Sequence, residues 1–176
     1  MKKLLIIVDY QNDFVTGSLG FSKAEMLEEP ICRKIAEYRN AGDDIVFTFD
    51  THGENYLQTK EGRMLPISHC SRDSDGWQLY GKVSALKAPS DVIFEKPTFG
   101  SVGLMNYLIE HQYKSIELCG LVTNMCVLSN AVIAKTAQPD AEIIIDAACT
   151  ASFDDTLHEK TLDVLSSIHC TITNRN

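Results

Sequence analysis

Cys126 lies in an eight-residue stretch, Gly120-Leu-Val-Thr-Asn-Met-Cys-Val127, between two apolar segments. Residues 115–121 have the pattern of a buried strand, and residues 127–135 have that of a packed helix. Cys126 is therefore expected near the first turn of a helix, where free N–H groups and the positive end of the dipole favour a thiolate. The same N–H groups could stabilise an oxyanion formed when sulfur attacks a carbonyl carbon. Most buried cysteines are inert, so this stretch alone does not establish a nucleophile.

Three more chemically capable residues stand where predicted strands end. They are Asp9, Asp50 and Lys96. Ligands of open parallel sheets bind beyond the carboxyl ends of the strands, so we expect these residues to meet Cys126 at one edge. There Asp9 would act as the general base for the thiol of Cys126, and Lys96 would lower the pKa of that thiol. The chemistry predicted is hydrolysis of an amide-like bond through a thioester.

A second group begins with Asp50-Thr51-His52 and continues with Glu61 and His69. Imidazole and carboxylate ligands suit a divalent metal, with zinc expected first and manganese, iron or magnesium as alternatives. Surface histidines and acids are common, so the spacing leaves both a metal site and an ordinary polar cluster open.

Strands and helices alternate along the chain. Strands are predicted at residues 3–9, 44–50, 91–95, 115–121, 142–146 and 170–173, and helices at 30–41, 77–86, 102–111, 127–135 and 156–167. Residues 10–23 are expected to form a loop, and residues 51–76 a long irregular segment. This alternation predicts one domain over residues 1–176, a three-layer, doubly wound α/β fold with a mainly parallel six-stranded sheet and helices on both faces.

Composition excludes several classes of protein. The formal charge of −8 argues against nucleic acid or an anionic membrane as partner. The apolar run at residues 4–8 is too short for a secretory signal, and no run approaches the roughly 20 residues of a membrane span, so a cytoplasmic protein is expected. The six cysteines form no Cys-x-x-Cys pair, which favours reduced thiols.

Three motifs in order resemble those of the isochorismatase-like cysteine hydrolases, and most closely the nicotinamidase branch. They are Ile6-Ile-Val-Asp-Tyr-Gln-Asn-Asp-Phe14, Phe94-Glu-Lys-Pro-Thr-Phe-Gly-Ser101 and the stretch that contains Cys126. The resemblance implies a catalytic set of Asp9, Lys96 and Cys126. It also implies a cis peptide bond between Leu121 and Val122, which would direct the Val122 N–H beside the Cys126 N–H as an oxyanion hole.

The resemblance also implies a metal held by Asp50, His52 and His69, with Glu61 as a fourth ligand. This metal would bind the pyridine nitrogen of nicotinamide.

The resemblance implies that Phe14 lines the substrate pocket, and Leu65 and Trp77 are the other candidates for substrate binding. Leu65 stands where nicotinamidases commonly have tryptophan, and Asn124 stands where the family often has aspartate. Nicotinamide, or a similar small aromatic amide, is the substrate expected first, and because of these departures an N-carbamoyl or ureido compound is kept as the alternative. A non-catalytic binding protein on the same fold is the alternative from another class. The resemblance further implies a homo-oligomer acting on a small-molecule amide.

Overall fold

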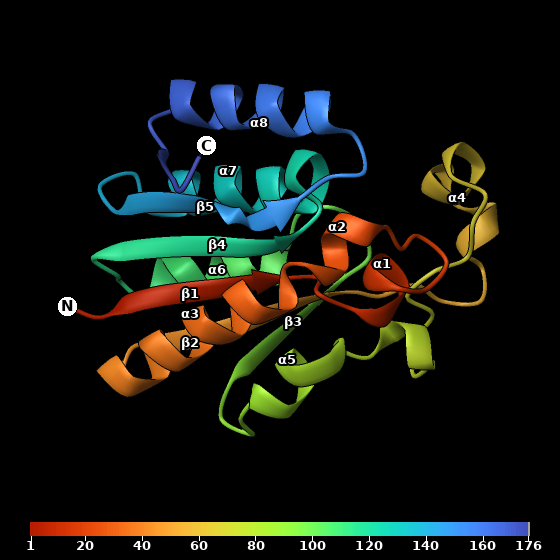
Figure 1. Cartoon of the computed structure of the whole chain (residues 1–176), viewed down its shortest axis with the longest axis horizontal. Coiled ribbons are helices and arrows are strands. Elements are labelled where there is room, and N and C mark those ends of the chain that lie inside the picture. The colour runs from red at the N-terminus through yellow and green to blue at the C-terminus, as the bar shows by residue number, and fades with distance from the viewer. Residues whose placement is uncertain (176) are drawn as a thin grey trace.

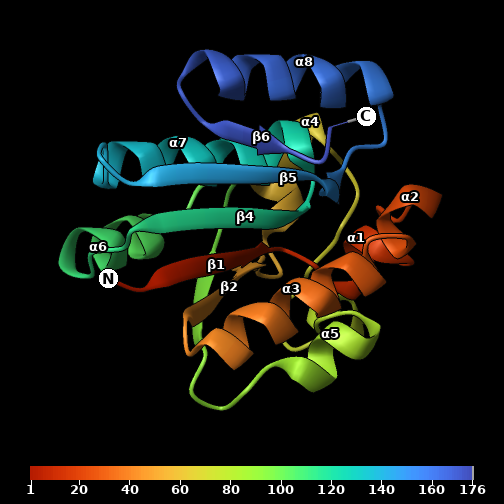
Figure 2. The same cartoon turned by 60° about the vertical axis from the view of Figure 1, so that its left-hand side comes forward.

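Six parallel strands form one sheet in the order β3-β2-β1-β4-β5-β6 (Figure 1 shows β1 to β5, and Figure 2 shows β6). The computed structural model describes residues 1–175. The strands are β1 (Lys3–Val8), β2 (Asp44–Asp50), β3 (Val92–Lys96), β4 (Ser115–Leu121), β5 (Glu142–Ala151) and β6 (Thr171–Thr173). All six predicted strands are confirmed.

Helices cover both faces of the sheet and complete three layers (Figure 2). On one face lie α3 (Glu28–Ala41) and α5 (Gly81–Leu86), and on the other α6 (Val102–Glu110), α7 (Leu128–Ala137) and α8 (Asp155–Ser167). The predicted doubly wound α/β fold is confirmed. Within the described residues, no helix is long and apolar enough to cross a membrane.

Strand β1 explains why the sequence shows continuous apolar runs and not alternation. Its residues Leu4 and Ile6 enter the core under α6, α7 and α8, whereas Leu5 and Ile7 enter the core under α3 and α5. All four side chains are fully buried, and each contributes about 2 kcal/mol of apolar burial. A parallel strand covered on both faces has no solvent side, so it needs no polar alternation.

The structure corrects two segments that were predicted to lack regular structure. Two short helices, α1 (Asn12–Val15) and α2 (Ser22–Glu25), interrupt the segment that we expected to be a loop. The irregular segment after β2 contains α4 (Lys60–Met64) and the 3₁₀ turns Tyr56–Gln58 and Asp75–Trp77. Helices this short offer little periodicity to detect.

Strand β5 extends beyond its predicted end. Its pairing with β4 passes from Leu118–Ile145 to Gly120–Thr150, so residues 146–149 form a bulge. The polar and small residues of the bulge hide the continuation of the strand in the sequence.

The strand order creates a crevice between β1 and β4. The chain crosses to opposite sides of the sheet after these two neighbouring strands, and such a switch point is where doubly wound folds bind ligands. Asp9 follows β1 directly, and the turn that contains Cys126 follows β4.

Candidate active site

Cys126 lies in a wide helical turn, Thr123–Val127, which joins β4 to α7. The N–H of Val127 donates to the carbonyl of Val122 over 3.3 Å, so the turn is of the π type and α7 begins after it. The peptide bond between Leu121 and Val122 is cis, as the family resemblance implied. Cys126 is 6% exposed and lines a cavity together with Val122.

Gly120 permits the close approach of this turn to β1. Its φ is +112°, and an added Cβ would lie 2.1 Å from the backbone oxygen of Val8. A side chain would have to displace the backbone, so only glycine fits this position.

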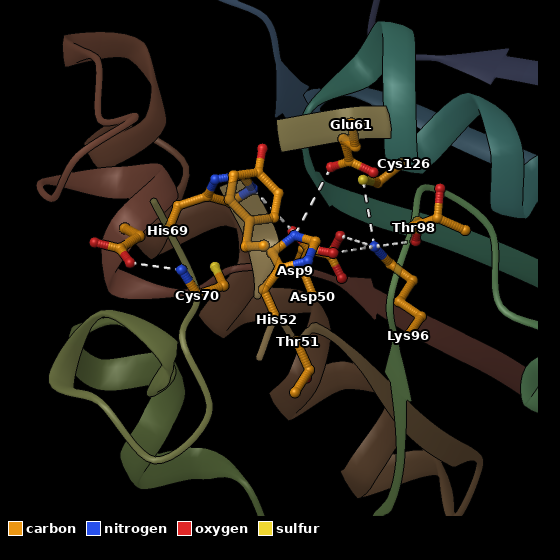
Figure 3. Close-up of polar contacts among 12 residues, drawn as sticks. Asp9, Asp50, Thr51, His52, Glu61, His69, Cys70, Lys96, Thr98 and Cys126 are labelled. Atoms are coloured by element: carbon orange, nitrogen blue, oxygen red, sulfur yellow. Dashed lines mark hydrogen bonds and ion pairs between the residues drawn. The ribbon is translucent and has the colours of Figure 1, made fainter. Parts of the chain in front are cut away.

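Lys96, at the end of β3, joins the charged groups of the site (Figure 3). Its Nζ lies 2.7 Å from Asp9 Oδ2, 3.4 Å from Asp50 Oδ1 and 3.4 Å from Cys126 Sγ. Nζ also donates to the carbonyl of Thr98 over 3.0 Å. The lysine is 1% exposed, so four strand ends meet at one buried ammonium group, as the strand-end rule predicts.

Asp9 is fully buried and held in a defined orientation. Thr48 donates its hydroxyl to Asp9 Oδ1 over 2.6 Å, while the other carboxylate oxygen pairs with Lys96. The φ of Asp9 is +45°, a left-handed conformation that non-glycine residues adopt with strain. This backbone conformation brings the carboxylate to the crevice directly after β1.

Burial raises the pKa of the Cys126 thiol well above its ordinary value, and the nearby Asp9 carboxylate raises it further. Lys96 lowers this pKa, as predicted, but does not outweigh burial. Burial also raises the pKa of Asp9 against the opposing effect of Lys96. The resting thiolate that the sequence led us to expect is therefore corrected to a thiol beside a base of raised proton affinity.

Asp50, His52 and His69 offer one candidate ligand atom each, all within 4.8 Å of one another. Asp50 Oδ2 lies 3.0 Å from His52 Nε2 and 3.3 Å from His69 Nε2. Burial raises the pKa of Asp50, but hydrogen bonds from the two histidines and the charge of Lys96 lower it overall, so the group is a carboxylate. Glu61 lies farther out, with Oε1 3.8 Å from His52 Nε2.

The donor set fits a divalent metal. The carbonyl of Ile67 lies 2.8 Å from His69 Nδ1, which fixes this nitrogen as the donor and leaves Nε2 free to bind a metal. The ring of Tyr56 packs 4.5 Å from His52 and 4.9 Å from His69. Two imidazoles and one carboxylate held in this way match the ligands of open zinc sites.

A cavity of about 330 Å³ is lined on one side by the candidate metal ligands Asp50 and His69 and on the other by Cys126. Its walls are mostly apolar, and they consist of Phe14, Leu19, Met64, Leu65, Phe99, Val122, Met125 and Phe153, with Asp50, Glu61, His69 and Cys126 as the groups of the two sites. Phe14 and Leu65, two of the candidate substrate-binding residues, are among the residues that line it.

Trp77 does not line this cavity, so its assignment to the pocket is corrected. Its ring packs 5.1 Å from Phe49, and its Nε1–H donates to Thr51 Oγ1 over 2.8 Å. These contacts place the indole beside Thr51, which stands between the candidate metal ligands Asp50 and His52.

Several residues that support the site were missed from the sequence. Gln11, which is fully buried, accepts from the Asp50 N–H over 2.8 Å and donates to the Asp50 carbonyl over 3.0 Å. Asp13 accepts from the Cys70 N–H over 2.7 Å, next to the metal-capable His69. Asn130 donates to the Cys126 carbonyl over 2.8 Å. Gln11 and Asp13 lie in the motif after Asp9, but their partners are more than 35 residues away and leave no local signal.

A buried cysteine, an acid and a lysine at the switch point of a doubly wound sheet define a cysteine hydrolase, with a metal-capable group across the same cavity. The comparisons with known proteins agree with this class. A family model described as Isochorismatase domain matches residues 3–176. The chain belongs to the isochorismatase family, and the predicted class of amide-hydrolysing enzyme is confirmed.

Three comparisons, one with a sequence and two with solved structures, illustrate the similarity. An isochorismatase family protein PncA of Bacillus subtilis is 32% identical over 90% of this chain and 91% of its own length. The crystal structure of nicotinamidase PncA from Bacillus subtilis superimposes with a TM-score of 0.87 at 32% identity, covering 98% of this chain and 99% of that one. The pyrazinamidase/nicotinamidase of Streptococcus mutans has a TM-score of 0.87 at 26% identity, covering 97% and 99%.

Proposed function

We propose that the enzyme hydrolyses nicotinamide, or a closely related small aromatic amide, to the carboxylic acid and ammonia. The observation that carries this proposal is the contact of one buried lysine, Lys96, with both Asp9 and Cys126 at the wall of an apolar cavity. The similarity to nicotinamidases of known structure supports the same substrate class.

The chemistry proposed begins with proton transfer. Asp9 takes the thiol proton of Cys126 as sulfur attacks the amide carbon, so that an S–C bond forms and the carbonyl electrons move to oxygen. The N–H groups of Val122 and Cys126 stabilise this oxyanion. When the C–N bond breaks, Asp9 returns its proton to the leaving nitrogen, and ammonia departs.

Hydrolysis of the thioester uses the same groups in reverse order. Asp9 takes a proton from water, and the oxygen of that water attacks the acyl carbon. Collapse of the second oxyanion breaks the S–C bond, releases the acid and returns the proton to sulfur. Lys96 keeps its positive charge throughout, because its pKa is raised by Asp9, Cys126 and Asp50 against the opposing effect of burial.

Asp50, His52 and His69 would hold a divalent metal, with Glu61 near it. Zinc is the metal proposed, because two imidazoles and a carboxylate with open positions suit it, with manganese, iron or magnesium as alternatives. A bound metal would supply a Lewis acid that anchors a ring nitrogen or a water molecule. Phe14 and Leu65 would hold the flat apolar face of the substrate.

The apolar cavity favours an aromatic amide over an N-carbamoyl or ureido substrate. Ureido derivatives of amino acids carry a carboxylate, and the residues that line the cavity include no lysine or arginine to pair with it. Contact of Lys96 with Asp9 and Cys126 favours catalysis over a purely binding role. We further propose that residues 1–176 act as one hydrolase domain within a homo-oligomer, in the cytoplasm.

The test compares substrates. Purified enzyme is incubated with nicotinamide, pyrazinamide and N-carbamoylsarcosine, and ammonia and the acid products are measured. We expect kcat/KM to be highest for the two aromatic amides. A higher kcat/KM for N-carbamoylsarcosine would show that the enzyme is an N-carbamoyl hydrolase instead. If none of the three compounds releases ammonia, the result would favour a non-catalytic binding protein.

A further inference from the structure

Thr123 follows the proposed oxyanion donor Val122 directly, and its side chain is anchored away from the substrate cavity. The residue is fully buried. Its Oγ1 lies 2.8 Å from His158 Nδ1 on α8 and 2.9 Å from Thr150 Oγ1 on β5. Three elements that are distant in the sequence thus meet at one hydroxyl group beside the turn of Cys126.

The bulge in β5 makes this contact possible. Beyond the shift in pairing at residues 146–149, Thr150 pairs with Gly120 and Ala151 with Leu121. The hydroxyl of Thr150 therefore stands beside the start of the turn.

The surroundings of His158 favour the neutral imidazole, which can act as a hydrogen-bond acceptor. Burial lowers its pKa, and Lys23 and Arg175 lower it further, against the opposing effects of Glu159 and Asp155. A neutral imidazole can accept at Nδ1 while Nε2 carries the proton. In that tautomer Thr123 donates to His158 and accepts from Thr150, so the buried hydroxyl of Thr123 is satisfied both as donor and as acceptor.

We infer that His158 and Thr123 are positioning residues for the oxyanion hole. His158 fixes the Thr123 hydroxyl, and Thr123 in turn fixes the direction of the adjacent Val122 N–H. The inference rests on the proposed acyl transfer to Cys126. An N–H that stabilises a developing oxyanion must be held close to its productive position, since a shift of about 1 Å can cost about 100-fold in rate.

His158 is reachable without passing through the substrate cavity. It lines a second cavity of about 540 Å³, together with Lys23, Thr150, Asp155 and Glu159. This second cavity shares no lining residue with the cavity at Cys126. Small molecules can therefore replace a deleted imidazole there without competing with substrate.

The test uses His158→Ala and Thr123→Val, each measured on nicotinamide and on p-nitrophenyl acetate. Ester cleavage also requires acyl transfer to Cys126 and an oxyanion, but it needs no recognition of nicotinamide. We expect kcat to fall about tenfold or more on both substrates, with KM changed less than about twofold. Alkylation of Cys126 by iodoacetamide forms no oxyanion, so its rate should stay near that of the wild type.

Matched variants separate positioning from general damage. Thr123→Ser keeps the hydroxyl and His158→Asn keeps a hydrogen-bonding group near Nδ1, so both should retain most of kcat. Thr161→Val removes another buried hydroxyl, which donates to the Leu157 carbonyl within α8, and it should leave kcat unchanged.

The double variant Thr123→Val/His158→Ala tests whether the two residues act through the same hydrogen bonds. The double variant should be no slower than the slower single variant, because both changes break one chain of hydrogen bonds. Added imidazole should restore kcat of His158→Ala but not that of the double variant. The inference is overturned if kcat is unchanged in the single variants, or if the alkylation rate falls by the same factor as kcat. A wild type that cleaves the ester but no aromatic amide overturns the proposed substrate alone.

Discussion

Replacing Lys96 with methionine removes the positive charge at the centre of the site while nearly preserving side-chain volume. Asp9 would then remain fully buried without its cation, which lies 2.7 Å from Oδ2 in the native protein. Two unit charges at that distance attract by about 6 kcal/mol at an effective dielectric constant of about 20. In the native protein, the cost of desolvating both ions cancels part of this attraction.

The loss of stability has an upper bound, because Asp9 can take up a proton. Neutralising a carboxyl group with an unfolded-state pKa of about 3.9 costs about 4 kcal/mol at pH 7. We therefore expect Lys96→Met to lower the free energy of unfolding by about 3–4 kcal/mol at pH 7. Burial already raises the pKa of Asp9 in the native protein, and without Lys96 it rises further, so the variant regains stability relative to the wild type as pH falls. At pH 5 the deficit should shrink to about 1.5 kcal/mol.

Urea unfolding of wild type, Lys96→Met and the double variant Asp9→Asn/Lys96→Met provides the assay. The double variant removes both charges, so it should be more stable than Lys96→Met alone. Both variants should lose amide hydrolysis. A double variant that is less stable than Lys96→Met, or a stability deficit of Lys96→Met that does not change between pH 7 and pH 5, would refute this reasoning.

Three other changes test other parts of the molecule. His69→Ala should reduce the metal content of protein purified without chelator to less than about a tenth, measured by elemental analysis. Lys34→Met should lower the free energy of unfolding by about 2–3 kcal/mol at pH 7, since Nζ lies 3.0 Å from Asp146 Oδ2. Burial raises the pKa of Asp146, but hydrogen bonds from Asn174 and Lys34 lower it overall, so the deficit should shrink below about pH 4 as the carboxyl group protonates. Gly120→Ala should cost about 3 kcal/mol or more in thermal unfolding, because its Cβ would overlap backbone atoms of β1.

The sequence predicted what depends on local pattern. Apolar runs identified the strands from β1 to β5, and the strand-end rule brought Asp9, Lys96 and Cys126 together without any knowledge of contacts. That rule succeeds because parallel strands all end at the same edge of the sheet.

What the sequence could not predict depends on burial and on distant contacts. The protonation state of Cys126 cannot be predicted without knowing how deeply the residue is buried. The helix terminus and Lys96 alone favour a thiolate, whereas desolvation favours the thiol. Trp77 is close to His69 in sequence, yet its indole N–H is satisfied by Thr51 away from the cavity. The contact of Thr123 with His158 depends on the bulge in β5, and the pattern of residues there resembles a loop.

The central claim is that Cys126 carries the acyl group of an amide substrate. The most direct measurement is the release of ammonia and nicotinate from nicotinamide by the wild type and by Cys126→Ala, with circular dichroism to verify that both are folded. The account predicts equal amounts of the two products from the wild type and none above background from the folded variant. Continued release of both products by Cys126→Ala would contradict it.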